Sequence, residues 1–433
     1  MGTALLVNNG RGIVEKLAEI PTISLLLLRP CGFNQPLILL TKQSVENGKC
    51  SIMMTSPIQA NLFSNNGEFP FSSELDKIYE RIDQVNPSAY AKTRNYLDGA
   101  VSRLSPYISR GVISTRTVME RLYKNGWTFF QMEKFAQELA WRDYWQCIWQ
   151  VRNVSEDLKH PQQQVRNVGV PVPVFLASTG IVSVDQSLSE LYVKGYIHNH
   201  MRMYVAAIIC NMAGCHWRHP ARWMYAHLLD GDWASNALSW QWVAGANSNK
   251  KYYANQENIN KYSKHHQRNT FLDWPYEQMI SKGSALLDWE CRPFEINTEL
   301  PKIEKALKVN SQTPTLIYNS YNLDPTWRKG FTCQRILLLE PAHYQQYPVS
   351  QKVLNFILEL AGKIPDIQIF VGSFDELEAQ LKGSEIHFKE HPLNYHYKGI
   401  EASRDWLTPV SGYYPSFFAY WKKARKYLIQ EFG

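Results

Sequence analysis

The spacing of apolar residues constrains the fold of this chain most. From about residue 73 to residue 290, apolar positions follow the helical repeat of about 3.6 residues, and few runs resemble strands. This part of the chain is therefore predicted to be mainly helical. Helices are expected over Ser73–Asn86, Ser114–Asn125, Glu133–Val151, Val184–Lys194 and His198–Met212, with a further helix after Pro220.

The pattern changes near residue 331, where short apolar runs alternate with helical segments. Strands are predicted over Arg335–Glu340, Asp366–Val371 and Glu385–Lys389, with helices over Ser350–Ala361 and Asp375–Leu381 and a last helix over 415–430. Such alternation predicts a small parallel α/β module. We therefore expect an N-terminal extension over 1–70, a helical domain over 71–330 and an α/β module over 331–433.

Composition narrows the functional classes. The net charge of +7 and the pI near 8.8 suit a polyanion partner without requiring one. Aromatic residues make up 13% of the chain, and such rings can stack on bases or relay electrons. The seven scattered cysteines suggest reduced thiols, and no apolar run reaches the ~18 residues that span a bilayer. We expect a soluble, cytoplasmic protein.

Two common ligand motifs are absent or unconvincing. Neither the G-x-G-x-x-G nor the G-x-x-x-x-G-K-[ST] phosphate loop occurs, so a bound nucleotide must be held in another way. Cys210, Cys215, His216 and His219 cluster in sequence, but their spacing fits no standard zinc finger. We predict no metal site.

The segment from His198 to Trp242 holds the densest group of polar and aromatic residues. Asn199, Arg202 and Met203 fall at i, i+3 and i+4, so they share one helix face. Asp230-Gly231-Asp232 then places two carboxylates around a glycine. A buried carboxylate needs a cation or hydrogen-bond donors, and Arg202 is the candidate partner of Asp230.

A second stripe lies on the helix predicted over Glu133–Val151. Glu138, Trp141, Arg142 and Trp145 fall at i, i+3, i+4 and i+7 and line one side. Alone, this stripe could equally be a solvated face with two anchoring tryptophans. Together with the Asp-Gly-Asp turn, it favours a ligand site.

Four sequence blocks carry a family resemblance. They cover residues 90–114 (YAKTRNYLDGAVSRLSPYISRGVIS), 135–144 (FAQELAWRDY), 179–203 (TGIVSVDQSLSELYVKGYIHNHMRM) and 228–242 (LLDGDWASNALSWQW). Their order and spacing resemble the FAD-binding domain of the DNA photolyase and cryptochrome family. The resemblance implies a mainly α fold, with an all-helical FAD-binding domain, and the cofactor FAD.

The resemblance also implies which residues hold the cofactor. Phe135 and Arg142 match flavin contacts, and Arg202 and Asp230 match an ion pair beside the isoalloxazine. Asp232, after Gly231, matches another flavin contact, and Asn236 matches the residue that faces flavin N5. The segment that holds the FAD phosphates is matched by Tyr90, Val101, Ser102, Arg103, Leu104 and Ser105. Val101 stands where the family often has Thr, and Phe135 where it often has Trp.

A further set matches the substrate side of class I photolyases. Arg94 matches a DNA contact, and Asn199 after His198 resembles the dimer-repairing branch, since the branch that repairs (6-4) lesions carries paired histidines. Trp240 and Trp217 match two members of the electron relay, but no tryptophan lies between Trp149 and Trp217 to supply the third. Contacts with a flipped pyrimidine dimer are implied for Glu138, Trp141, Asn199, His200, Met203 and Trp242.

The resemblance implies a deoxyribodipyrimidine photo-lyase, a carbon–carbon lyase that splits cyclobutane pyrimidine dimers in DNA by electron transfer from light-excited, reduced FAD. The alternatives are a cryptochrome-like photoreceptor, which binds FAD without repairing DNA, and a flavoprotein that only binds single-stranded DNA. We expect a monomer. The family's α/β domain normally precedes the helical domain, whereas here it follows, as in a permuted or truncated relative. No residue pattern assigns an antenna pigment.

Overall fold

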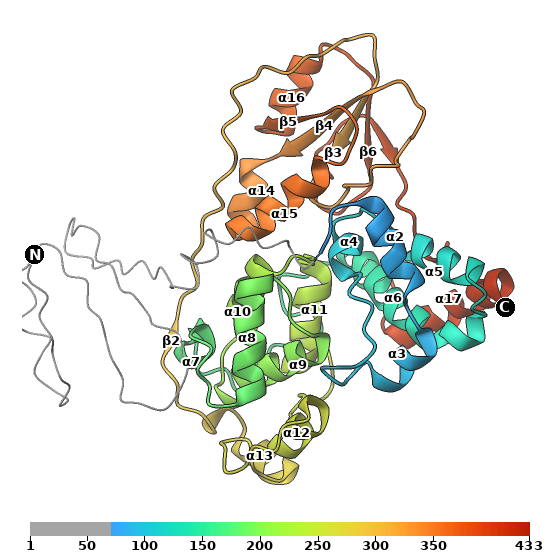
Figure 1. Cartoon of the computed structure of the whole chain (residues 1–433). Helices are drawn as coiled ribbons and strands as arrows, with labels where there is room; N and C mark the ends of the chain where they lie inside the picture. The colour runs from blue at the N-terminus through green and yellow to red at the C-terminus, as the bar shows by residue number, and fades with distance from the viewer. Residues whose placement is uncertain (1–70) are drawn as a thin grey trace, which may run out of the picture. The chain divides into compact units, whose positions relative to one another are not determined.

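The computed structural model describes residues 71–433, so the predicted extension over 1–70 lies outside the described residues. The first helices are α2 (Leu75–Asp83), α3 (Pro87–Thr93), α4 (Ser105–Ser109), α5 (Thr115–Lys124) and α6 (Phe129–Trp149). They are followed by α7 (Val172–Phe175), α8 (Val182–Lys194), α9 (Asn199–Ala207), α10 (Arg218–His227), α11 (Trp233–Ala244), α12 (Gln256–Ser263) and α13 (Tyr276–Lys282) (Figure 1). The predicted mainly helical domain is confirmed.

Local signals explain where several helices begin and end. Ser114 caps α5 as expected, because its hydroxyl accepts the N–H of Thr117. The helix predicted from Glu133 begins earlier, at Phe129, because Thr128 and Gln131 form a capping box. α9 continues into a π-helical turn, η1 (Ile208–Met212), so the two segments together fill the predicted helix His198–Met212.

The C-terminal part forms a five-stranded parallel sheet. Its strands are β3 (Thr315–Tyr318), β4 (Gln334–Leu339), β5 (Ile367–Val371), β6 (Ile386–Lys389) and β7 (Ile400–Ala402), in the order β5-β4-β3-β6-β7. The three predicted strands are confirmed. The sequence prediction missed β3 and β7, and the sheet therefore begins before residue 331.

The two faces of this sheet are covered by different helices. Leu337 and Leu339 join the main core with Val353 and Phe356 of α15 (Gln351–Ala361). Ile336 and Leu338 alternate with them and pack with α16 (Phe374–Leu381) in a smaller cluster. Alternation of side chains along each strand thus gives both faces an apolar cover, as parallel sheets require.

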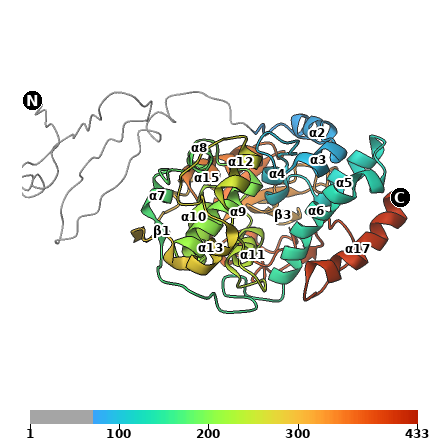
Figure 2. The same cartoon turned by 90° about the horizontal axis from the view of Figure 1, so that it is seen from below.

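Direct contacts join the helical part of the chain to the C-terminal part that contains the sheet. Ser350, before α15, donates its backbone N–H to the carbonyl of Ala226 in α10. The last helix, α17 (Phe417–Phe432), follows the sheet but packs against α6. Figures 1 and 2 both show α17 beside α6, on the side away from α9 and α10. No helix within residues 71–433 has both the length and the apolar character needed to cross a bilayer.

Candidate functional site

Arg202 and Asp230 form the ion pair that the sequence predicted. Arg202 Nη2 lies 2.8 Å from Asp230 Oδ2 and 3.1 Å from Oδ1. The Asp230 side chain is 2% exposed, and Arg202 also donates from Nε to the carbonyl of Ile197. Burial alone would raise the pKa of Asp230, but the charge and hydrogen bonds of Arg202, with help from Ser105 and Arg142, lower it below its ordinary value. Asp230 is therefore a fixed, buried negative charge.

A serine joins this pair to the second predicted stripe. Ser109, in α4, donates its hydroxyl to the backbone carbonyl of Asp230 at 2.8 Å. Arg142 of α6 donates from Nη1 to the same hydroxyl oxygen at 2.7 Å. The structure therefore brings Arg142, Arg202 and Asp230 into one polar cluster, although they lie on three different segments.

The predicted phosphate-holding segment lies beside this cluster. Arg103 adopts a positive φ of 52°, which turns the chain sharply before α4. Leu104 is buried, whereas Arg103 is exposed, and the charge of Arg103 acts to lower the pKa of both Tyr196 and His198, which precede α9. Tyr90 packs edge-on against Phe135 at 5.0 Å between ring centroids. This segment thus reaches the helix that carries Arg202.

Asp232 and Asn236 occupy the first turns of α11. Asp232 caps the helix by accepting the N–H of Ser235 at 2.7 Å, and its other oxygen accepts from Nε2 of Gln146. Asn236 donates from Nδ2 to the carbonyl of Ala221 at 2.8 Å, so its Oδ1 is the amide atom left to accept a hydrogen bond. Asn236 can therefore present an acceptor to a ligand N–H.

Two buried polar atoms at this cluster have no partner among the described residues. His198 Nε2 is unpaired beside Arg202 and Arg103, and burial with these nearby charges lowers the pKa of His198 to about 4. Ser235 Oγ is unpaired between Asp232 and Asn236. Buried polar groups are normally hydrogen-bonded. Unpaired groups here fit a polar ligand such as the predicted FAD.

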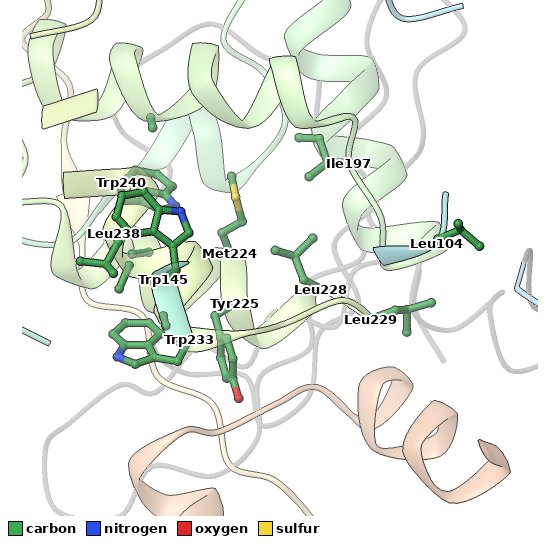
Figure 3. Packing of buried hydrophobic residues seen from close by; sticks show 14 of the residues in the cluster. Leu104, Trp145, Ile197, Met224, Tyr225, Leu228, Leu229, Trp233, Leu238 and Trp240 are labelled. Carbon is green, nitrogen blue, oxygen red and sulfur yellow. The ribbon is translucent and has the colours of Figure 1, made fainter. Parts of the chain in front are cut away.

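The hydrophobic surroundings hold these polar residues in place. Figure 3 shows Leu228 and Leu229, in the turn between α10 and α11, and Trp145, Trp233 and Trp240 in the adjoining core. The backbone carbonyl of Leu229 also accepts a hydrogen bond from Nε of Arg110 at 2.9 Å. The Asp-Gly-Asp turn is thus fixed by packing on one side and by hydrogen bonds on the other.

The predicted substrate residues lie at the ends of the same helices and toward the surface. Asn199 is exposed at the start of α9, and Trp242 is 39% exposed near the end of α11. Glu138 is partly exposed and pairs with Lys134 at 3.0 Å and with Arg94 at 3.4 Å. Met203, one residue after Arg202, is partly buried. The surface residues therefore share α6, α9 and α11 with the buried cluster.

Trp141 and His200 have environments that the sequence did not predict. Trp141 stacks on Phe417 of α17 with ring centroids 3.7 Å apart and an interplanar angle of 9°, so one face of its indole is covered. His200 is buried, and its Nδ1 lies 2.8 Å from the carbonyl of Asn95. His200 thus ties α9 to the segment after α3, below the surface.

The two predicted relay tryptophans are both buried in the α10–α11 hairpin. Asn236 and Ala221 touch across this antiparallel pair; Trp240 lies one turn after Asn236 and Trp217 one turn before Ala221, so both lie toward the same end of the pair. Trp217 donates from its indole Nε1 to Asp157 Oδ1 at 2.6 Å. Within residues 71–433, the one ring in contact with Trp217 is that of His216. Among residues 71–433, no third tryptophan is in ring contact with Trp217.

Sequence reasoning missed Ser109, Gln146, Ser235 and the unpaired His198. Gln146 lies one turn after Arg142 on α6, and Ser109 lies one turn after Ser105 on α4. Their positions on helix faces already assigned to the site were the available signal. Neither residue type is distinctive enough to be chosen without the contacts.

A cavity of about 90 Å³ lies at the carboxyl ends of β3 and β6. Its wall includes Asn319, His391, Arg404 and, from α6, Asp143 and Arg142. Arg142 is the one predicted cofactor residue in this wall. The cavity therefore adjoins the cluster around Asp230, because Arg142 belongs to both.

Comparisons with known proteins show which family this part of the chain resembles. The family described as the FAD binding domain of DNA photolyase matches residues 135–273, which include Arg142, Arg202 and Asp230. The cofactor is FAD. The residues that would hold it remain those proposed from the sequence.

Relatives share part of their length with this chain. A deoxyribodipyrimidine photo-lyase of Streptomyces griseus is 31% identical over 155 residues, which cover 35% of this chain and 34% of the relative. One of Agrobacterium fabrum is 26% identical over 240 residues, 50% of this chain and 46% of the relative. The matched part thus spans about a third to a half of these relatives. A solved cryptochrome of Synechocystis is 24% identical, with a TM-score of 0.37, over 45% of this chain and 44% of that one.

Proposed function

The chain belongs to the DNA photolyase and cryptochrome family, and we propose that it is a photolyase that splits cyclobutane pyrimidine dimers in DNA. When bound, reduced FAD supplies the electron that a blue or near-ultraviolet photon releases. The chain itself must hold the cofactor, admit a flipped dimer beside it and exclude water. The proposal therefore depends on the buried polar cluster around Arg202 and Asp230 and on the accessible residues beside it, Glu138, Trp141, Asn199 and Trp242, which we call the rim.

The observation that carries the proposal is that α9 and α11 each carry buried polar residues near exposed ones. The buried pair of Arg202 and Asp230 lies one turn inside the exposed Asn199. Asp232, the N-cap of α11, is buried and Asn236 in its first turn is partly buried, whereas Trp242 near its end is exposed. A cofactor held by the inner residues would thus face a substrate bound by the outer ones.

Glu138 and its neighbours suit a pyrimidine substrate. Glu138 is held by Arg94 and Lys134, so its carboxyl group is oriented at the rim of the site. A positioned carboxyl group can hydrogen-bond a pyrimidine or move a proton at its carbonyl oxygen. Asn199 can hold a second carbonyl, and the indole of Trp242 offers a flat apolar wall.

The indole of Trp141 offers a second wall, and Phe417 supports it. Because Phe417 stacks on one face of Trp141, that face is closed to a base and the indole is fixed in orientation. We propose that α17 thereby pre-organises the dimer-binding side of Trp141.

The test is a repair assay with the purified protein. The flavin is reduced, an oligonucleotide with one thymine dimer is added, and half of the sample is illuminated while half stays dark. Recovery of intact thymines only in the light supports the proposal. Flavin binding and photochemistry without recovery would instead support a photoreceptor that does not repair DNA.

A further inference from the structure

The C-terminal helix α17 lies outside residues 135–273, which the family match covers, yet it reaches the substrate side of the site. Phe417 stacks on Trp141, and Arg425 pairs with Glu133 through contacts of 2.6 and 3.0 Å. Phe417 and Arg425 are eight residues apart along α17, and their partners Trp141 and Glu133 are eight residues apart along α6 in the opposite direction. The helices are antiparallel, and α17 begins beside Trp141 and leads away from it.

The outward face of α17 is basic and aromatic. Phe418 is 68% exposed, and Lys422 and Lys426 follow it at successive intervals of four residues, on one stripe. Lys423 is also exposed, with its ammonium 5.1 Å from the ring of Tyr414. The opposite face, with Trp421, Ala424 and Leu428 among others, is buried.

These three lysines have no carboxylate partner in the part of the chain that the structure describes. Within residues 71–433, no Asp or Glu oxygen lies within 4.0 Å of the ammonium of Lys422, Lys423 or Lys426. The one other cation and the one acidic residue of α17 are paired within the protein, since Arg425 pairs with Glu133 and Glu431 with Arg116. Like charges at i and i+4 on a helix are mildly destabilising. Within residues 71–433, these ammonium groups have no carboxylate to neutralise them, and their arrangement suits an external polyanion.

We propose that α17 is a DNA-binding element that contacts the phosphate backbone beside the lesion through Lys422, Lys423 and Lys426. The inference rests on the proposed function, because it takes the rim around Trp141 as the place where the lesion enters. At 16 residues, α17 is about 24 Å long, the rise of about seven base pairs. Duplex leaving the rim along α17 would meet the lysines in turn, with Phe418 nearest the lesion.

The test is a triple substitution, Lys422→Gln with Lys423→Gln and Lys426→Gln, in the full chain with FAD bound. Binding to a labelled duplex is measured by fluorescence anisotropy from 50 to 200 mM salt. Each lost phosphate contact lowers the slope of log K against log salt by about 0.9, so a decrease of about 2 to 3 is expected. Affinity falls equally for intact and dimer-containing duplex, because phosphates carry no lesion information.

Matched variants make the result specific. Lys302→Gln with Lys305→Gln and Lys308→Gln changes the net charge equally at three exposed lysines between α13 and β3, and should leave the slope unchanged. Replacing the three α17 lysines by arginine should restore the wild-type slope. A wild-type slope in the α17 glutamine variant would overturn the proposal, as would equal losses in both glutamine variants. Loss of binding to anionic vesicles instead of DNA would also overturn it.

The proposed function has a separate readout in the same experiment. Preference of the wild-type protein for dimer-containing over intact duplex, together with light-driven thymine recovery, tests repair. Absence of both with a lysine-dependent slope would reject repair and retain α17 as a DNA-binding element. If the wild-type protein prefers dimer-containing duplex and recovers thymines in the light, but the α17 glutamine variant keeps the wild-type salt slope, only the role of α17 is rejected.

Discussion

Arg404 donates a hydrogen bond from Nη1 to Oε1 of Gln146 at 2.7 Å. Gln146 in turn donates from Nε2 to Asp232, which caps α11 in the proposed flavin site. Burial lowers the pKa of Arg404, while the nearby carboxylates of Asp143, Asp232 and Glu390 oppose that effect. The segment after the sheet therefore reaches the cofactor site through a single amide of α6.

This link predicts the effect of Gln146→Leu. The substitution keeps the volume but leaves Asp232 and Arg404 without their shared partner, at a cost of about 1–3 kcal/mol. We expect FAD to bind about tenfold more weakly, measured by flavin fluorescence titration. Gln150→Leu, at the exposed end of the same helix, is the control and should bind FAD normally. Equal affinities in the two variants would show that the amide does not support the site.

The pair of Arg202 and Asp230 predicts a non-additive effect. Arg202→Met strands a carboxylate that is 2% exposed, and breaking a buried pair from one side costs about 3–5 kcal/mol. Urea unfolding of the FAD-free protein measures this loss. Adding Asp230→Asn removes the stranded charge and should recover much of the stability. A double variant no more stable than Arg202→Met would contradict this interpretation.

Asp143 predicts how stability depends on pH. Burial raises its pKa to about 6, although Thr115 and the N–H of Leu407 donate to it and Arg404 lies near. The native state then holds a proton that the unfolded state, with a pKa of about 3.9, releases earlier. The free energy of unfolding should therefore fall as pH rises from about 4 to 6, by at most ~3 kcal/mol. Asp143→Asn should flatten this fall, and an unchanged profile would exclude Asp143 as its source.

Glu138→Ala with Asn199→Ala should separate repair from cofactor binding. Both residues lie at the accessible rim, so FAD content and folding should be retained. The thymine yield per absorbed photon should fall at least ~10-fold, since positioned acid–base groups contribute that much or more. Glu299→Ala with Asn297→Ala, at exposed positions before the sheet, is the control. Loss of FAD from the first variant would mean that the rim and the cofactor site are not separate.

Much of this architecture follows from residue patterns. The helical period located α5, α8 and α15, and the apolar run before Glu340 located β4. The pairing of Arg202 with Asp230 was predictable, because a carboxylate in an apolar stretch needs a cation. Strand β3 was missed because its four residues give too short a run to separate from a loop.

The rest depends on contacts between distant segments. The stacking of Phe417 on Trp141 joins positions 276 residues apart, and nothing in either local sequence indicates it. The same holds for Arg404 and Gln146. The resemblance placed His200 among the substrate contacts, but the segment after α3 covers it. Such features follow from tertiary packing, which local periodicity does not encode.

The most direct test of the account is the flavin content of the purified protein. One FAD per chain is expected from its absorption spectrum after denaturation, in the wild type and in the rim variant Glu138→Ala with Asn199→Ala, with little or none in Arg202→Met. A folded wild-type protein that is colourless and does not take up added FAD would contradict the assignment of the cluster around Arg202 and Asp230 as the cofactor site.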